Sequence, residues 1–252
     1  MKQRQYIDFL NKIEKLKCNT RHSWTSSGRQ ESVAEHSWRL AVMTMLCADE
    51  YPDLDINKVI KMCLVHDFGE AITGDIPAFL KTAQNEIDED SAVVKLLSEL
   101  PADFRNELQT LFDEMNARVT PEAKLFKSLD NLEALVSHNE ADISTWLPRE
   151  YEENLTYGQK NCEWSDWTKE LKEEIKKDSI DVFVNTVFLY NDRFLLTLNF
   201  GYGSKTVLFT DIPCSDKVAC GRPKINRSQG VFALRSVDFL YLLHKSQFFI
   251  EI

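Results

Sequence analysis

The chain has 252 residues, of which 43% are hydrophobic and 28% are charged, and it carries a net charge of −10. This length accommodates one sizeable domain and a smaller piece, and the composition is that of an ordinary soluble globular protein. The negative charge disfavours non-specific binding to a nucleic-acid backbone, so we expect no nucleic-acid partner. We also expect no membrane association, because no apolar run reaches membrane-spanning length and no leader-like segment begins the chain.

Cysteine usage bears on the compartment. The six cysteines include no CxxC pair and show no regular disulfide spacing. Cys47 and Cys63 lie within apolar runs of helical character. This usage is typical of reduced thiols and predicts a cytoplasmic protein.

The balance of charged residues and the spacing of apolar residues both change near Lys177–Ser179. Residues 1–178 carry 22 Lys and Arg against 34 Asp and Glu, whereas residues 179–252 carry 8 against 6. Helical periodicity gives way at the same place to alternating β-branched and aromatic residues. We therefore predict a helical domain over 1–178 and a small β-rich extension of unknown role over 179–252.

The N-terminal third of the chain predicts two helices joined by a loop. Apolar residues recur at steps of three and four over residues 3–17, which predicts an amphipathic helix. A polar loop follows from Cys18 to Glu31. Ser32 and Glu35 then form a capping-box pattern that opens the next helix. His36 lies in the first turn of that helix and faces the core, where spacing alone favours a hydrogen-bonded core histidine.

The next predicted helix begins after Asp55 and ends in an unusual pair. Its apolar run leads into His66 and Asp67, and Glu70 follows one turn later. Burying two ionisable neighbours beside a core is costly unless something pairs with them. Imidazole nitrogen and carboxylate oxygen together suit Zn, Mn, Fe, Co or Ni, so a divalent cation is the natural partner. The alternative is a helix that merely ends in a polar patch.

A loop and two further helices follow this pair. Residues Ile72–Ala83 predict a loop over the site, because Gly69 and Gly74 permit the turns that end the preceding helix. Two helices are predicted near 84–100 and 102–117, on either side of a proline.

A second anomaly lies on the helix that begins at Thr120 and Pro121. Thr120 is a good cap, and proline is favoured at the first helical position. The apolar stripe of this helix contains Asp130, where an unpaired carboxylate would be costly. A metal explains its presence, and a partly exposed aspartate paired with a neighbouring lysine is the alternative.

The C-terminal part mixes helix and strand signals. Residues 142–162 are loop-like, and Trp164–Lys177 predicts a last helix. Residues Val182–Tyr190, Arg193–Phe200 and Lys205–Phe209 predict three strands that form a meander.

Taken in order, these features resemble a known superfamily. His36, the adjacent His66 and Asp67, and the distant Asp130 resemble the signature of HD-domain metal-dependent phosphohydrolases. Further matches resemble the branch that contains bacterial 5′-deoxynucleotidases, and the resemblance covers roughly residues 5–175. The segments that carry it are Arg21, Glu31–His36, His66-Asp67-x-x-Glu70 and Thr73–Pro77. The fold that this resemblance implies is an all-α HD-domain helical bundle, followed here by the β-rich extension.

The resemblance implies one divalent metal ion (Mn, Co, Mg, Zn, Fe or Ni) held by His36, His66, Asp67 and Asp130. Two imidazoles and two carboxylates leave coordination positions open, as catalytic sites require. An ion in such a site can polarise a phosphoryl oxygen and acidify a bound water.

The resemblance also assigns roles beside the metal. Glu70 and Asp75 become the acid and base, in an order that the sequence leaves open, and Arg21 becomes a bidentate phosphate clamp. For Glu70 the alternative is a helix-end surface residue, and for Asp75 it is an ordinary turn residue after glycine.

We therefore expect a metal-dependent phosphohydrolase of the 5′-nucleotidase type (EC 3.1.3) that removes phosphate from a phosphomonoester. The substrate implied is a 5′-deoxynucleoside monophosphate, which places the enzyme in nucleotide metabolism. The resemblance favours a homodimer, and the cysteine usage favours the cytoplasm. One alternative is a nucleoside triphosphate or cyclic-nucleotide hydrolase with the same site. Another is a non-catalytic nucleotide- or metal-binding module, against which the intact Glu70 and Asp75 argue.

Two departures from the family pattern concern aromatic and histidine positions. His22 follows Arg21 where the bacterial enzymes tend to have an aromatic residue, and Trp24 is either its substitute or a structural anchor. Two-iron oxygenase relatives need additional histidines soon after the HD pair. His138 comes eight residues after Asp130 and points about 80° away from it on an ideal helix. We therefore expect one metal and hydrolysis.

The tail carries a separate, short resemblance. Residues Phe183–Asp192, Leu198–Phe200 and Lys205–Val207 are similar to the C-terminal end of large serine recombinases. That likeness implies an appended fragment from a mobile-element junction. The alternative is a lineage-specific β extension that packs on the helical domain.

Overall fold

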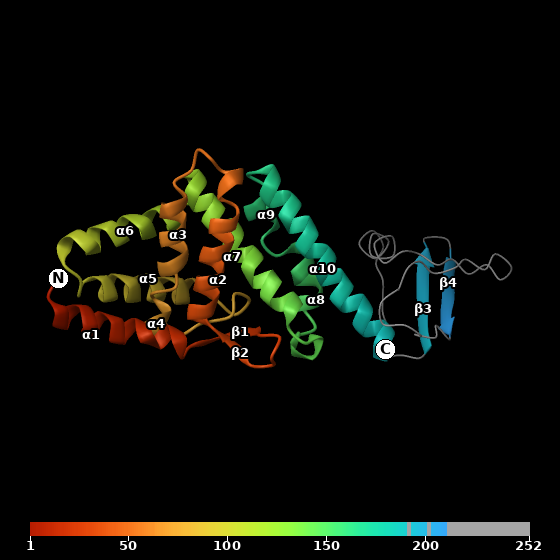
Figure 1. The fold of residues 1–252 in the computed structure, drawn as a ribbon. Coiled ribbons are helices and arrows are strands. Elements are labelled where there is room, and N and C mark those ends of the chain that lie inside the picture. The colour runs from red at the N-terminus through yellow and green to blue at the C-terminus, as the bar shows by residue number, and fades with distance from the viewer. Residues whose placement is uncertain (191–192, 201–202, 211–252) are drawn as a thin grey trace. The chain divides into compact units, whose positions relative to one another are not determined.

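Helices dominate the first 175 residues of the computed structural model (Figure 1). The structure describes residues 1–190, 193–200 and 203–210, with side chains as far as residue 182. It divides into two compact units, Met1–Ile175 and Lys176–Ile252. The elements in chain order are α1 (Gln3–Ile13), η1 (Glu14–Lys17), β1 (Thr20–Trp24), β2 (Gln30–Ser32), α2 (Val33–Leu46), η2 (Ala48–Glu50), α3 (Ile56–Val65), α4 (Glu70–Thr73), α5 (Ala83–Leu97), α6 (Ala102–Ala117), α7 (Pro121–Glu140), η3 (Ile143–Thr145), α8 (Glu150–Thr156), α9 (Gln159–Cys162), α10 (Asp166–Tyr190), β3 (Arg193–Phe200) and β4 (Gly203–Thr210).

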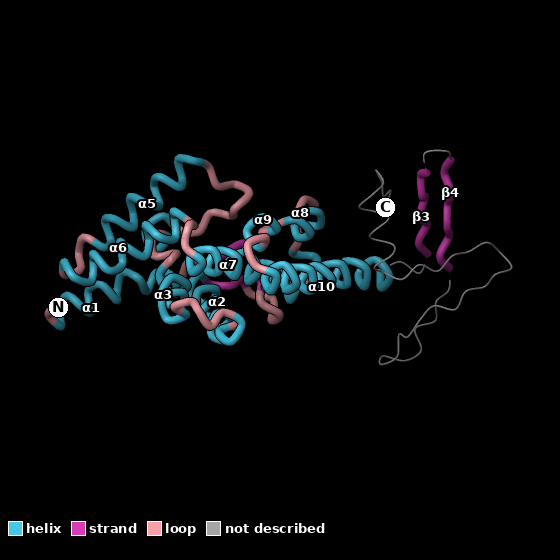
Figure 2. Tube along the Cα trace, turned by 90° about the horizontal axis from the view of Figure 1, so that it is seen from above, coloured by secondary structure: helices cyan, strands magenta, loops and turns pink. Residues whose placement is uncertain are grey.

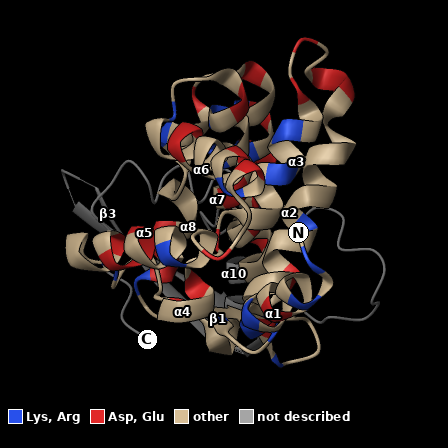
Figure 3. Cartoon of the chain, turned by 90° about the vertical axis from the view of Figure 1, so that its left-hand side faces the viewer, with Lys and Arg blue, Asp and Glu red and all other residues tan. Residues whose placement is uncertain are grey.

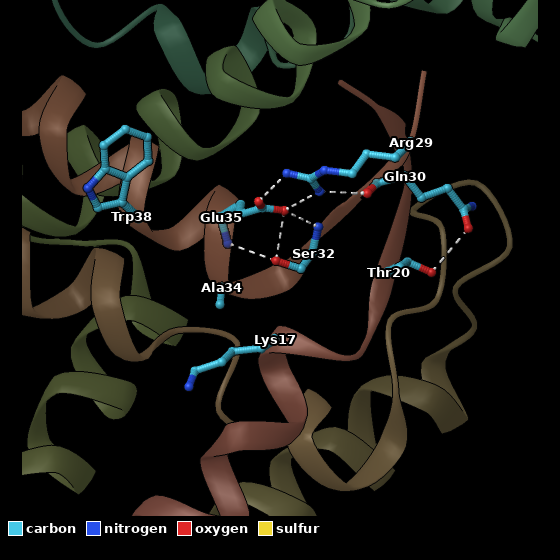
Figure 4. Close-up of a pocket in the computed structure, with 8 residues that line it drawn as sticks. All are labelled: Lys17, Thr20, Arg29, Gln30, Ser32, Ala34, Glu35 and Trp38. Carbon is cyan, nitrogen blue, oxygen red and sulfur yellow. Dashed lines mark hydrogen bonds and ion pairs between the residues drawn. The ribbon is translucent and has the colours of Figure 1, made fainter. Parts of the chain in front are cut away.

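Helix starts follow their capping residues as predicted. The Ser32 side chain accepts a hydrogen bond from the Glu35 backbone N–H, and the Glu35 carboxylate accepts from Ser32 N at 2.9 Å. Figure 4 shows this capping box, in which Arg29 also reaches the Glu35 carboxylate, with Nη1 2.9 Å from Oε2. Asp55 caps α3, and Thr120 caps α7 with proline in its first turn. These caps satisfy backbone N–H groups that would otherwise lack partners.

The segment predicted as a polar loop over Cys18–Glu31 is instead a short antiparallel ribbon. Strand β1 pairs with β2, with Thr20 opposite Ser32 and Trp24 opposite Gln30. Its turn contains Gly28, whose φ of +84° suits glycine. The prediction was wrong because these strands are short and mostly polar, so no alternation of apolar residues marks them.

The core lies where α2, α3 and α7 pack against one another, with α6 against α3 and α7. Figures 1 and 2 show α7 running beside α2 and α3. Leu40, Val59, Met62 and Leu129 are fully buried there. This packing matters for function because the predicted ligands lie on these same three helices.

Two secondary-structure predictions near the end of the helical unit were wrong. Residues 142–162, predicted as a loop, contain η3, α8 and α9. The predicted strand Val182–Tyr190 is instead the end of α10, which runs on from Asp166. The helices within 142–162 are too short to show a helical period, and an apolar run such as Val182–Tyr190 does not separate helix from strand by periodicity alone. The predicted helices at 3–17, 84–100 and 102–117 are confirmed to within a few residues.

The described part of the second unit contains an antiparallel pair of strands. Strand β3 pairs with β4 in register from Arg193 opposite Thr210 to Phe200 opposite Gly203. The predicted strands 193–200 and 205–209 therefore exist, but the residues described here form a pair and not the predicted three-stranded meander. Residues 211–252 lie outside the described residues, and the β-rich character of the whole extension and its likeness to recombinases stay predictions. No helix in the described ranges is long and apolar enough to cross a membrane.

Candidate metal-dependent active site

The four residues predicted as metal ligands come together between α2, α3 and α7. Ligand atoms of His36, His66 and Asp67 all lie within 4.8 Å of one another. Asp130 joins them, with its Oδ1 3.1 Å from His36 Nε2 and 3.7 Å from His66 Nε2. All four side chains are at most 15% exposed.

Each ligand position follows from the local fold. His36 sits in the first turn of α2, directly after the capping box, and is buried. His66 is the C-cap of α3, and Asp67 follows where the helix ends. Asp130 lies midway along α7. Because these helices pack together, side chains far apart in sequence converge at one point.

The two imidazole rings are held by partners on their other nitrogens. His36 Nδ1 contacts Glu133, which leaves Nε2 facing Asp130. His66 Nδ1 lies 2.9 Å from the Cys63 carbonyl oxygen and donates to it, so a neutral ring presents its Nε2 lone pair to the site. Fixing one nitrogen in this way sets the tautomer and the direction of the other, as in metal-ligating histidines.

A buried atom without a partner provides a direct test of the fit to a cation. His66 Nε2 is buried and makes no hydrogen bond, although Asp67 Oδ2 lies 3.0 Å away. A carboxylate cannot donate to an unprotonated nitrogen, and an unsatisfied buried polar atom is costly. A divalent cation between the two would satisfy both. The residues present therefore fit a metal.

Opposing effects set the charges of the ligands. Burial raises the pKa of Asp67, but His66 and His36 hold it down to about 2. Burial likewise acts on Asp130, whose pKa is nevertheless well below its usual range because of Lys127 and His36. Burial lowers the pKa of His36, yet its carboxylate neighbours raise it to about 9. His36 thus holds a proton that a metal would displace, which makes metal binding pH-dependent.

Asp130 also has the lysine partner that its alternative interpretation requires. Lys127 Nζ lies 2.6 Å from Asp130 Oδ2, three residues earlier on α7. The other oxygen, Oδ1, faces the two histidines. The two interpretations of Asp130 therefore coexist, since one oxygen pairs with the lysine and the other remains for a cation.

Arg21, the predicted phosphate clamp, reaches the site from β1. Its Nη1 lies 3.1 Å from Glu31 Oε2 and 3.4 Å from Glu133 Oε2. Burial opposes its charge, but the neighbouring carboxylates, Glu133 and Asp67 foremost, raise its pKa. The guanidinium is thus held in place beside the ligand cluster.

Two buried carboxylates here were missed from the sequence. Glu133 is fully buried and binds His36, Arg21 and Arg39, and Glu31, which is also buried, binds Arg21 as well. Glu133 had a recognisable signal, because it comes three residues after Asp130 on the same face of α7. Glu31 carried none beyond its place in the family-like segment.

Glu70, one of the two proposed acid–base residues, is the first residue of α4 and is only 6% exposed. Its burial excludes the alternative of a helix-end surface residue. Burial, followed by repulsion from Asp67, Asp75 and Glu89, raises its pKa to about 10. Its Oε2 is buried and makes no hydrogen bond. Without a cation nearby, the raised pKa favours the protonated form of this carboxyl at neutral pH, beside the predicted ligands.

Asp75 lies in the segment that follows α4. It comes after Gly74, whose φ is +76°, and burial raises its pKa while Arg21 opposes the rise. The predicted loop Ile72–Ala83 is correct except at its ends, since Ile72 and Thr73 complete α4 and Ala83 begins α5.

Glu89, which the sequence did not single out, brings α5 onto this edge of the site. Figure 3 shows α5, with its acidic residues in red, beside α4. A Cβ on Gly69 would lie 2.9 Å from both the Glu89 carbonyl oxygen and Cγ, so glycine permits this approach. Carboxylate oxygens of Asp67, Glu70 and Glu89 lie within 4.8 Å of one another, and Lys81 pairs with Glu89.

His138 does not join the ligand cluster. It groups instead with His22 and Glu150. Trp24 packs edge-on against His22, with ring centroids 5.0 Å apart, so it supports that histidine.

Comparison with known proteins identifies the fold. The sequence model of the HD domain matches residues 13–172, which is most of the helical unit. The chain belongs to the HD domain family. The HD motif itself is the His66–Asp67 pair at the end of α3.

Relatives in this family carry related descriptions. The 5′-deoxynucleotidase hdd1 of Schizosaccharomyces pombe is 31% identical over 170 residues, covering 60% of this chain and 85% of that protein. The human 5′-deoxynucleotidase HDDC2 is 34% identical over 141 residues, covering 54% and 68% of the two chains. A solved structure described as a predicted metal-dependent phosphohydrolase, from Magnetospirillum magnetotacticum MS-1, superposes with a TM-score of 0.61 at 29% identity over 71% of this chain and 93% of that one. The chain is therefore an HD-family, metal-dependent phosphohydrolase.

Proposed function

We propose that this HD-domain protein is a 5′-deoxynucleotidase, which removes the phosphate from a 5′-deoxynucleoside monophosphate. The observation that carries the proposal is the convergence of His36, His66, Asp67 and Asp130 beside a buried, protonated Glu70. The curated relatives described as 5′-deoxynucleotidases support the choice of substrate.

One divalent cation would be held by His36, His66, Asp67 and Asp130. Their mixture of imidazole and carboxylate suits Mn, Co, Zn, Fe or Ni, and Mg is the other candidate. When bound, such a cation polarises a phosphoryl oxygen and acidifies a coordinated water. Glu133 keeps the His36 ring directed at the site, and the Cys63 carbonyl does the same for His66.

The environments of Glu70 and Asp75 support assigning one of them as the general acid and the other as the general base. Glu70 keeps its proton at neutral pH, so we assign it as the acid that protonates the departing 5′ oxygen. Asp75 is less buried, and Arg21 and Lys81 both oppose the rise in its pKa. We assign it as the carboxylate that accepts a proton from the attacking water.

Arg21 would bind the phosphate of the substrate. Among the described residues its two ion pairs, with Glu31 and Glu133, both use Nη1, which leaves Nη2 for a phosphate oxygen. Because those carboxylates fix the guanidinium before substrate arrives, little conformational entropy is lost on binding.

We also propose a cytoplasmic homodimer that acts in nucleotide metabolism. The exposure of Trp38 (64%) and Met45 (60%), seven residues apart on α2, supports association through an apolar face. Light scattering of the purified chain at several concentrations measures the oligomeric state, and a monomer throughout would contradict a stable dimer.

A phosphate-release screen tests the activity and separates it from its rivals. The substrates are 5′-deoxynucleoside monophosphates, ribonucleotides, cyclic nucleotides and triphosphates, each with Mn, Co, Mg or Zn. We expect the highest kcat/KM for a 5′-deoxynucleoside monophosphate and none for the Asp67→Asn variant. A preference for triphosphates or cyclic nucleotides would select the other hydrolase, and binding without turnover would select a non-catalytic module.

A further inference from the structure

A second cluster of metal-ligating side chains lies on β1, α7 and α8, outside the HD site. His22 Nε2 is 3.1 Å and His138 Nε2 is 3.5 Å from the same atom, Glu150 Oε1. The three ligand atoms all lie within 4.8 Å of one another. Two imidazole nitrogens and one carboxylate oxygen therefore face a common point.

The cluster is a built site and not a chance meeting of surface groups. Glu150 and His138 are 5% and 6% exposed. The His138 Nδ1–H donates to Asn154 Oδ1, 3.2 Å away, so the outer nitrogen carries the proton and the Nε2 lone pair is directed inward. Trp146 stacks on the His138 ring, with centroids 4.9 Å apart and an angle of 19°. Such support of the outer nitrogen is typical of histidines that bind metals.

The carboxylate is held in the same way. Glu150 Oε2 accepts a hydrogen bond from the Leu147 backbone N–H at 2.5 Å, so Oε1 is the oxygen left for the two histidines. The backbone bond fixes the side chain at the start of α8, where it turns back toward α7.

An unsatisfied atom shows that hydrogen bonds alone do not complete the cluster. His22 Nε2 is buried and makes no hydrogen bond, although Glu150 Oε1 is within 3.1 Å. The distance is short enough but the geometry is not that of a hydrogen bond. A buried polar atom without a partner is costly, and a cation at the common point would remove that cost.

We propose that His22, His138 and Glu150 bind a second divalent cation, with Zn²⁺ the best match. Two histidines and one glutamate form a donor set that zinc favours, with a fourth position left for water. The site shares no ligand with the HD cluster, and the proposal does not rest on the deoxynucleotidase activity. It adds one ion to the single metal that the sequence predicts.

Occupancy of this site would tie β1 to α7 and α8. His22 directly follows Arg21 in β1, so a cation there holds the strand that carries the phosphate-binding arginine. A ligand that binds only the folded state raises stability, so zinc should raise the melting temperature through this site alone.

Metal counting on the full chain tests the proposal. Metal-free protein is loaded with Zn²⁺, passed through a desalting column and analysed for zinc per chain. We expect two equivalents for the wild type, one for Asp67→Asn, one for Glu150→Gln and none for the double variant. Glu153→Gln on the same helix α8, a partly exposed residue paired with Arg149, is the matched control and should keep two.

The melting temperature gives an independent readout. Zinc should raise it for Asp67→Asn but leave it unchanged for Asp67→Asn/Glu150→Gln. Equal zinc content in Glu150→Gln and Glu153→Gln would overturn the second site, as would a single equivalent in the wild type that Asp67→Asn removes. If Glu150→Gln lacks the wild-type circular dichroism, His22→Gln replaces it, because His22 is the least buried of the three ligands.

Discussion

Glu70 is a buried carboxyl group whose pKa is raised both by desolvation and by neighbouring negative charges. Burial and three neighbouring carboxylates hold its proton, and it does not belong to the proposed ligand set. Glu70→Gln should therefore keep metal and substrate affinity while lowering turnover by about 10²–10⁴-fold, the usual contribution of general acid–base catalysis. Steady-state kinetics and zinc or manganese content measure the two effects separately. Unchanged turnover would remove Glu70 from the chemistry.

The same group predicts the alkaline side of the pH profile. An acid with a raised pKa of about 10 is competent below that pH and loses its proton as the pH rises through it. A cation beside Asp67 offsets part of the repulsion on Glu70, so the fall in kcat/KM of the loaded enzyme is expected below pH 10. Glu70→Gln should abolish this fall. An alkaline limb identical in the variant and the wild type would assign it to another group.

A substitution at Arg21 tests whether phosphate binding requires the planar guanidinium group. Arg21→Lys keeps the charge but loses the fixed guanidinium that Glu31 and Glu133 hold, so KM should rise or kcat fall. Arg29→Lys is the control, since Arg29 pairs with Glu35 at the surface. Kinetics with a mononucleotide that are the same for both variants would make Arg21 a structural cation only.

Among single residues, the sequence indicated the members of the HD cluster better than the side chains that support them. His36, His66 and Asp130 are recognisable because each places an ionisable group on an apolar helix face. Glu89 was missed because its approach to Asp67 and Glu70 depends on the packing of α5 against α4. Glu133 was missed despite its spacing from Asp130, because its pairing with Arg21 spans 112 positions. No local pattern records such a pairing.

Two glycines in connecting segments separate the cost of a positive φ from the cost of a steric clash, because both have a positive φ but only one is closely packed. Gly158 has φ +72°, and a Cβ there would lie 2.7 Å from the Asn131 Cβ on α7. Gly28 has φ +84°, with no atom within 4 Å of such a Cβ. Gly28→Ala should cost about 1–2 kcal/mol of unfolding free energy, from φ alone.

Gly158→Ala should cost a further 1–3 kcal/mol or so, because α9 must move away from α7. Urea unfolding of both variants measures the difference. Equal losses would show that the start of α9 yields freely and that close packing on α7 is unimportant there.

The helices that the sequence predicted are those with long amphipathic patterns or strong caps. Ser32, Asp55 and Thr120 mark three helix starts correctly. The ribbon β1–β2 and the short helices α8 and α9 were missed. They are stabilised by packing against the long helices, and their own sequences show no clear periodicity. The missed elements carry His22 and Glu150, and so the second cluster was invisible in the sequence.

For the whole chain, every residue proposed for catalysis lies in the unit Met1–Ile175. A chain ending at residue 178 should therefore fold, bind metal and release phosphate, with some loss of solubility or melting temperature because α10 is cut within its range. Circular dichroism, metal content and phosphate release of the truncated chain check this. A folded, metal-loaded truncation without activity would show that residues 179–252 complete the site.

The central claim is that the HD cluster binds the cation on which hydrolysis of a deoxynucleotide depends. The most direct measurement is phosphate release from 2′-deoxyadenosine 5′-monophosphate by metal-free wild type and Asp67→Asn as Co²⁺ is added. The wild type should start inactive and gain activity to saturation, while Asp67→Asn stays inactive at every concentration. Equal release by the two proteins, or full activity of the metal-free wild type, would contradict the account.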